Sequence, residues 1–190
     1  MDERQLVERC RRHDGKAQRE LYRSYVARLR AVCLRYVSVS EDAEDLLQDA
    51  FVKIFSAMDT FRYRGEGSLW GWMKQITVNL AVDSLRRQDR FRLMPLDEGV
   101  MDREEPDAEE VALLSEEVLL RLVGELPTGY RTVFNLCCIE GLSHREAARL
   151  MGIAEHSSSS QLSRARSLLA QKINDYLEAG PMNSPLEMTE

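Results

Sequence analysis

The sequence predicts an all-α protein of two small helical domains joined by an acidic linker, with a helix-turn-helix in the C-terminal domain. Apolar residues recur at helical spacing wherever a period is present, and no segment alternates as a strand would. The 190 residues allow one or two domains, and 44% hydrophobic with 31% charged residues is ordinary for a soluble chain. Residues 93–117 hold ten acids against one base, Arg103, and include Pro95, Gly99 and Pro106. We therefore predict domains at 1–92 and 111–180, a linker at 93–110 and a disordered tail at 181–190.

Two amphipathic helices are predicted in the first half of the N-terminal domain. The first buries Leu21, Tyr25, Leu29, Val32, Cys33 and Tyr36, and the second buries Leu46, Leu47, Ala50, Phe51, Ile54 and Phe55. The outward face of the second helix carries Asp45, Gln48, Asp49 and Lys53. That face is either solvated or a docking surface for a basic partner, and periodicity does not choose between these readings.

The segment 61–92 combines aromatic and basic side chains. A glycine-containing loop of Gly65, Glu66, Gly67 and Ser68 precedes a helix that ends on Arg86 and Arg87. Ile76, Leu80 and Leu85, with Trp72 or Met73, form the expected buried stripe, which leaves Lys74, Asn79, Asp83 and Arg86 facing outward. Aromatics interleaved with bases are typical of single-stranded nucleic-acid binding. We assign Trp72 to the core and leave Trp70 open between core and base stacking.

The segment 140–169 predicts the helix-turn-helix. Ser143 and Glu146 have the spacing of a capping box, and Gly152 suits the left-handed position that ends a helix. A second helix is predicted to start on a serine cap at Ser157 and to bury Leu162, Ala165 and Leu169. Such a helix fits the DNA major groove. The competing interpretation is an ordinary helical hairpin, because the four serines at 157–160 are mediocre helix formers.

Other classes of function are disfavoured. No apolar run approaches the roughly 20 residues that span a bilayer, and the charged N-terminus does not resemble a signal peptide. Cys10, Cys33, Cys137 and Cys138 lack metal-ligand spacing and are predicted to be buried thiols in a reducing cytoplasm. The three histidines lie near no plausible nucleophile or metal set, so we expect no enzyme, cofactor or metal.

Three segments in this order resemble the extracytoplasmic-function (ECF) sigma factors, small members of the housekeeping-type bacterial sigma family. Residues 42–55 (DAEDLLQDAFVKIF) look like the segment that binds core RNA polymerase. Residues 61–87 look like the promoter-melting, minus-ten segment, and residues 126–166 are similar to the minus-thirty-five domain. The resemblance implies a cytoplasmic factor that directs promoter-specific initiation and has no catalytic residues.

The resemblance also implies roles for individual residues. Asp45, Gln48 and Asp49 would contact the clamp coiled coil of core polymerase. Gly65, Glu66, Gly67 and Ser68 would cradle a flipped minus-ten base, Asn79 would help read it, and Lys74, Arg86 and Arg87 would suit phosphates. Ser159, Ser160, Ser163 and Arg164 would face the minus-thirty-five element, with Gln161 and Arg166 available to phosphates.

This chain departs from the family pattern in the second helix of the motif. Family members commonly have a basic residue where Ser159 stands, often another at Gln161, and frequently a valine at Ser158. Fewer charges predict weak DNA binding by this domain alone, because each neutralised phosphate adds affinity through counterion release. The resemblance further implies an anti-sigma partner and a free monomer without membrane insertion. The alternative is a stand-alone helix-turn-helix regulator, which would bind DNA by itself as a dimer.

Overall fold

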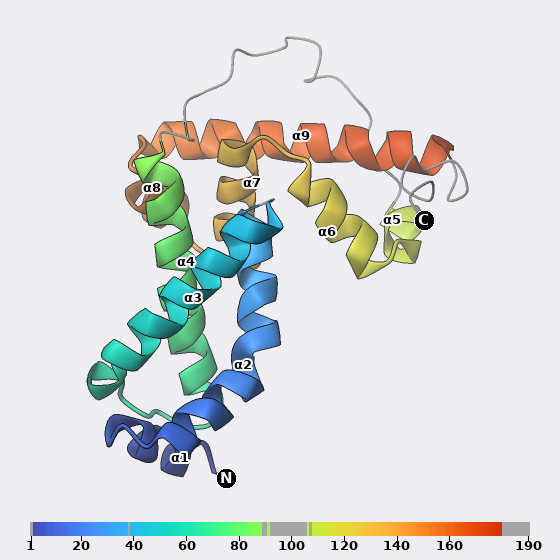
Figure 1. Ribbon diagram of the computed structural model, residues 1–190. Helices are drawn as coiled ribbons and strands as arrows, with labels where there is room; N and C mark the ends of the chain where they lie inside the picture. The colour runs from blue at the N-terminus through green and yellow to red at the C-terminus, as the bar shows by residue number, and fades with distance from the viewer. Residues whose placement is uncertain (1, 38, 89–90, 92–105, 107, 180–190) are drawn as a thin grey trace. The chain divides into compact units, whose positions relative to one another are not determined.

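In the computed structural model, the described residues are 2–37, 39–88, 91, 106 and 108–179, and all regular structure among them is helical (Figure 1). This confirms the all-α prediction. The chain divides into two compact units, Met1–Gln88 and Asp89–Glu190. Within the predicted linker at 93–110, only residues 106 and 108–110 are described, and helix α5 already begins there at Ala108. The predicted tail at 181–190 lies outside the described residues, and the proposed domain bounds stay a prediction.

The N-terminal unit is a helical bundle. Its elements are α1 (Glu3–Arg11), α2 (Gly15–Tyr36), α3 (Ser40–Ser56), the short 3-10 helix η1 (Met58–Thr60) and α4 (Ser68–Arg87). Helices α2, α3 and α4 pack against one another, and α1 packs on α2 (Figure 1). Leu21, Leu29 and Ile54 are completely buried in the core. Burying each such side chain contributes about 1.5–3 kcal/mol.

Asp14, at the start of α2, links this helix to α1. The Asp14 carboxylate caps α2 by accepting from the Lys16 and Ala17 amides at 2.9 and 3.3 Å. The same carboxylate accepts from the Arg9 guanidinium at 2.7 Å, from the last turn of α1. The Arg9 hydrogen bond, followed by those from the two amides, lowers the pKa of Asp14. One charged cap therefore fixes the angle between two successive helices.

The buried stripe of α4 differs from the one that the sequence predicts. Leu69, Met73, Val78, Ala81, Val82 and Leu85 are buried, whereas Ile76 and Leu80 are only half-buried. Trp72 is also half-buried and packs on Phe61, with ring centroids 5.1 Å apart. The prediction of Leu85 and Met73 was right, but Ile76 and Leu80 were wrong as fully buried positions. Because α4 packs against both α2 and α3, its buried face is wide and includes Thr77 and small side chains.

The C-terminal unit is built around one long helix. Its elements are α5 (Ala108–Leu113), α6 (Glu116–Gly124), α7 (Thr128–Phe134), the π-helix η3 (Asn135–Ile139), α8 (His144–Met151) and α9 (Glu155–Ala179). Helices α6, α7 and α8 all pack on α9 (Figure 1). The core includes Val133, Leu136, Ala147, Met151 and Ala165. The adjacent alanines of α8 are nearly inaccessible, as close approach of α9 requires.

Candidate nucleic-acid interface

The helix-turn-helix comprises α8, the turn at Gly152 and α9. Ser143 Oγ accepts from the Glu146 amide at 3.3 Å, and the Glu146 carboxylate accepts from the Ser143 amide at 2.9 Å. The predicted capping box is therefore present. These hydrogen bonds, that of the Ser143 side chain first, lower the pKa of Glu146. Gly152 ends α8 at φ 70°, the left-handed conformation that glycine adopts without strain.

Helix α9 begins earlier than the sequence predicts. Its first residue is Glu155, and the Ala154 carbonyl accepts from the amides of Ser157 and Ser158 at 3.0 and 3.2 Å. Ser157 is thus inside the first turn, and the prediction of a serine cap there was wrong. Tertiary packing of α9 on α7 and α8 outweighs the low helix propensity of the serine run.

The predicted DNA-facing residues of α9 divide by exposure. Ser159, Ser160, Ser163 and Arg166 are exposed, and Arg164 is half-buried. Gln161 is 1% exposed, with its Oε1 3.1 Å from the position of a Cβ added at Gly129 of α7. Its side chain therefore packs inside the unit and is not available to phosphates, which corrects the sequence expectation. A glutamine gave no sign of burial by itself, because its contact is with Gly129 of another helix.

Ser158 takes part in a polar contact between the two helices of the motif. It is completely buried, and its Oγ lies 3.1 Å from His144 Nδ1 at the start of α8. Cys137 Sγ lies 3.8 Å from the same nitrogen. The Ser158 hydroxyl is thus satisfied across the motif, which explains how serine is accommodated where an apolar residue is usual. Sequence reasoning missed His144 because its partner is 14 residues away.

The cysteines do not all match the expectation of burial. Cys10 and Cys33 are buried, and burial raises their pKa values to about 11 and about 12. Cys137 is half-buried with a pKa raised first by desolvation, but Cys138 is exposed and lies 3.8 Å from the Arg166 guanidinium. The prediction was therefore wrong for Cys138, because the π-helix turns this side chain outward.

A second candidate surface lies on α4 and the loop before it. Gly65 and Gly67 both have positive φ values, 119° and 81°. Ser68 Oγ donates to the Gly65 carbonyl at 2.6 Å and accepts from the Arg64 amide at 3.2 Å, which holds the loop closed. The exposed Glu66 lies between the two glycines. Added Cβ atoms at either glycine would meet nothing within 4 Å, so the requirement for glycine here is conformational.

The polar side chains of α4 lie beyond this loop. Lys74 and Asn79 are half-buried, and Asn79 Oδ1 accepts from Gln75 Nε2 at 3.0 Å. Arg86 and Arg87 are exposed at the end of the helix, and Arg86 pairs with Asp83 at 2.7 Å. Because an α-helix turns about 100° per residue, Asn79 and Arg86 lie on one face of α4, whereas Lys74 lies on another.

Trp70 connects α4 to α2. Its ring is stacked with that of Tyr25 at 6.3 Å and 6°, and the Arg28 guanidinium lies 4.0 Å from its centroid. The sequence left Trp70 open between core and base stacking. Its half-buried ring is covered by α2 side chains here, which favours a role in packing.

The exposed face of α3 carries the third set of predicted residues. Asp45, Gln48 and Asp49 are all exposed, and none of them forms an ion pair within the part of the chain described. Val52, one turn further on, is 69% exposed. In contrast, Glu44 pairs with Arg30 of α2 at 2.5 Å. The face thus combines unpaired carboxylates with an apolar side chain, which suits a basic partner with an apolar edge.

Two other classes of site are absent from the described residues. These contain no cluster of three or more histidine, cysteine or acidic side chains that could hold a metal ion. None of the described helices is both long and apolar enough to cross a membrane.

Comparison with known proteins identifies the family. The model of sigma-70 region 2 matches residues 21–91, and that of sigma-70 region 4 matches residues 116–169. The ECF RNA polymerase sigma-E factor of Escherichia coli K12 is 31% identical over 184 residues, which cover 90% of this chain and 94% of that protein. The ECF RNA polymerase sigma factor SigE of Mycolicibacterium smegmatis is 31% identical over 163 residues, 83% of this chain but 60% of that protein.

Among solved structures, the chain is similar to the sigma factor RpoE from Bartonella quintana, crystallised with the anti-sigma factor NepR. The TM-score is 0.48 at 22% identity, over 83% of this chain and 96% of that chain. The two matched regions occur in the order that the sequence predicts, one in each unit. Together with the identity to curated relatives over nearly their full length, they show that this chain belongs to the ECF family of RNA polymerase sigma factors, which direct transcription from promoters.

Proposed function

We propose that this sigma factor reads one promoter in two physical states, with its C-terminal unit on duplex DNA and its N-terminal unit on a melted strand. The observation that carries the proposal is the strip of exposed polar side chains, Ser159, Ser163 and Arg166, along the second helix of a capped helix-turn-helix. A helix presented in this way fits the major groove. We infer that it reads the minus-thirty-five element.

In this unit the proposed contacts are Ser159, Ser160, Ser163, Arg164 and Arg166. Arg164 is the best candidate for bidentate guanine readout, worth about 1–3 kcal/mol. Gln161 is buried, and Arg164 and Arg166 are the two basic side chains among these contacts. Affinity of this unit alone should therefore be low and should depend weakly on salt.

The N-terminal unit would bind the minus-ten element as a single strand. Unpairing a base costs a few kcal/mol, which contacts in a pocket must offset. The loop Gly65, Glu66, Gly67 and Ser68 has little side-chain bulk, so its backbone is accessible to a flipped base. Asn79 would help read that base, and Lys74, Arg86 and Arg87 would bind phosphates.

Core polymerase would bind the acidic face of α3. Asp45, Gln48 and Asp49 are exposed, and the two carboxylates are available to basic groups of the clamp coiled coil. The partner is thus proposed on charge complementarity together with the family. An anti-sigma partner and a monomeric free state stay predictions of the family resemblance. A stand-alone regulator would instead bind its DNA site without polymerase.

The decisive experiment is run-off transcription on fragmented genomic DNA with core polymerase, with and without this chain. New transcript starts that share two spaced upstream elements are expected. If no new starts appear, and the chain alone binds a palindromic site as a dimer, the reading of two promoter elements is wrong.

The polymerase contact is tested by reversing one charge. Asp49→Lys should abolish binding to core polymerase, measured by size-exclusion chromatography and fluorescence anisotropy. Asp59→Lys is the matched control, because Asp59 is an exposed acid outside α3 and undergoes the same change of charge. Equal affinity of the two variants would remove α3 from the interface.

The reading of the melted strand is tested at Asn79. Asn79→Ala should slow open-complex formation, followed by permanganate footprinting, more than it weakens initial promoter binding. Gln75→Ala is the matched control, since it removes the same hydrogen bond but keeps Asn79. Equal losses in both steps, or equal losses in both variants, would contradict a role in base readout.

A further inference from the structure

The first turn of α1 reaches the loop that precedes α4. Glu3 Oε2 accepts from the Gly67 amide at 3.3 Å, and Glu3 Oε1 accepts from the Leu69 amide at 3.4 Å. These contacts join residues 64 and 66 positions apart in the chain. Helix α1 lies outside the segment 21–91 that matches sigma-70 region 2, so the family match gives it no role.

The two amides are groups that α4 cannot satisfy alone. The first four amides of a helix have no partner within it, and a carboxylate is favoured beside them. The residue that precedes α4 is Gly67, which has no side chain to act as a cap. Ser68 is bonded back to the loop at Gly65 instead. Glu3 therefore supplies from another helix the cap that this sequence lacks.

The opposite end of α1 holds the same stretch of chain. The Arg11 guanidinium donates to the Phe61 carbonyl, and its Nε donates to the Met58 carbonyl at 3.4 Å. Glu3 and Arg11 are eight residues apart, or about 12 Å along a helix. Helix α1 is thus a brace that contacts the backbone of the connection between α3 and α4 at both of its ends.

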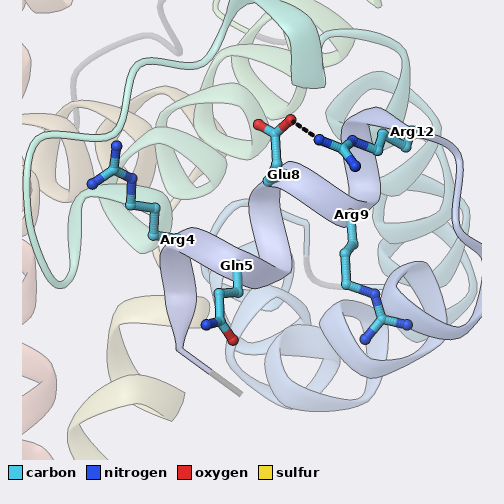
Figure 2. A pocket seen from close by; sticks show the side chains of 5 residues that line it. All are labelled: Arg4, Gln5, Glu8, Arg9 and Arg12. Carbon is cyan, nitrogen blue, oxygen red and sulfur yellow. Dashed lines mark hydrogen bonds and ion pairs between the residues drawn. The ribbon is translucent and has the colours of Figure 1, made fainter.

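The charges around Glu3 are mixed in sign. Desolvation raises the pKa of Tyr63, Asp2, Glu3 and Glu66 raise it further, and Arg4, which follows Glu3, opposes them. Arg4 also lines a hollow of about 410 Å³ on α1, where Figure 2 shows it pointing away from Arg9 and Arg12. Arg9 and Arg12 pair with Asp14 and Glu8, but Arg4 has no ion pair among the described residues. Arg4 therefore offsets only part of the negative charge beside this loop.

We propose that Glu3 is a positioning residue for base capture, which fixes Gly67 and the first turn of α4 in the conformation that receives the flipped minus-ten base. This role rests on the proposed function of the loop 65–68. Glu3 touches backbone amides and acts through them. The brace lowers the entropic cost of ordering the loop when DNA binds, because the loop is already ordered.

The test measures holoenzyme, formed with core polymerase, on two probes taken from a mapped promoter: a minus-ten single strand and a minus-thirty-five duplex. Glu3→Ala should weaken binding of the single strand about fivefold, as loss of hydrogen bonds worth about 1 kcal/mol implies, and leave the duplex unchanged. Glu3→Gln, which keeps one acceptor oxygen, should fall between. Gln5→Ala is the matched control, since Gln5 is an exposed residue of α1 two positions from Glu3 and, among the described residues, makes no hydrogen bond to the loop.

A second readout is independent of DNA. Amide hydrogen exchange at Gly67 and Leu69 should accelerate in Glu3→Ala and not in Gln5→Ala. Unchanged exchange at the Gly67 and Leu69 amides would show that Glu3 does not hold this loop in place. Tighter binding of the single strand by Glu3→Ala would show that Glu3 acts by repulsion, and equal loss on both DNA probes would indicate misfolding; either result overturns the positioning role.

A failure of the proposed function of the loop 65–68 would give a different result from a failure of the role of Glu3. If wild-type holoenzyme does not prefer the minus-ten strand over an unrelated strand, the proposed function fails and the positioning role fails with it. If the wild type shows the preference and Glu3→Ala binds the strand equally well, only the role of Glu3 is overturned.

Discussion

Helices α4 and α8 both begin in a segment proposed to read DNA, but their first turns are capped in opposite ways. At α8, Ser143 and Glu146 satisfy each other's amides from within the same four residues. At α4, Glu3 satisfies the Gly67 and Leu69 amides from a different helix. The capping box of α8 can form wherever the local sequence is helical. The cap of α4 forms only after α1 has packed against the rest of the unit. The motif proposed to read duplex DNA therefore begins on a locally specified cap, and the loop proposed to capture the melted strand is held by one that depends on tertiary structure.

The largest expected effect on stability comes from replacing Gly152, the residue that ends α8. Gly152→Ala should destabilise the C-terminal unit by about 1–2 kcal/mol, because Gly152 has a φ of 70° that alanine adopts only with strain. Gly71→Ala in α4 is the matched control: the site is exposed, its Cβ meets nothing within 4 Å, and about 0.5–1 kcal/mol of stabilisation is expected. Denaturant titrations followed by circular dichroism measure both, and tryptophan fluorescence reports α4 alone. Equal effects of the two changes would contradict the left-handed turn.

The next effect compares the two caps directly. Ser143→Ala should cost about 1 kcal/mol and accelerate amide exchange only in α8, because its capping box is self-contained. Glu3→Ala should accelerate exchange in α1 and α4 together. Hydrogen exchange resolved by residue measures both variants. Faster exchange in α9 alone, or no change in α8, would show that the box contributes nothing to this helix.

Acid should weaken the local cap. The pKa of Glu146 is lowered from its ordinary value of about 4.5, so its stabilising effect is complete above that value and is lost as the pH falls through the lower, folded value. Protection of the α8 amides should therefore decline below about pH 4.5 in the wild type. In Glu146→Gln the decline at these amides should be smaller; an identical decline would exclude Glu146 as its cause.

The smallest perturbation is chemical labelling of thiols, which compares the two units without changing their stability. Iodoacetamide under mildly alkaline conditions should modify the exposed Cys138 first and the half-buried Cys137 later. Cys10 and Cys33, buried in the N-terminal unit with pKa values of about 11 and about 12, should react last. Peptide mass spectrometry gives the order, and early labelling of Cys33 would indicate that this unit opens.

Features built from neighbouring residues were predictable. The capping box and Gly152 follow from spacing alone, and the exposure of Asp45, Gln48 and Asp49 follows from the helical period of α3. The wide buried face of α4 was predicted less well, because two partner helices cover it. The start of α9 was misplaced for a related reason, since packing on α7 and α8 extends this helix over residues of low propensity.

The sequence by itself determined the all-helical class, the family and the capping box of α8, because hydrophobic period and capping chemistry act within a few residues. Only the tertiary structure decided that Gln161 is buried, that Ser158 meets His144, and that Glu3 caps α4. Each of these depends on a partner at least 14 residues away. A single side chain carries no signal of such a partner, since the contact forms only when whole helices are packed by their apolar faces.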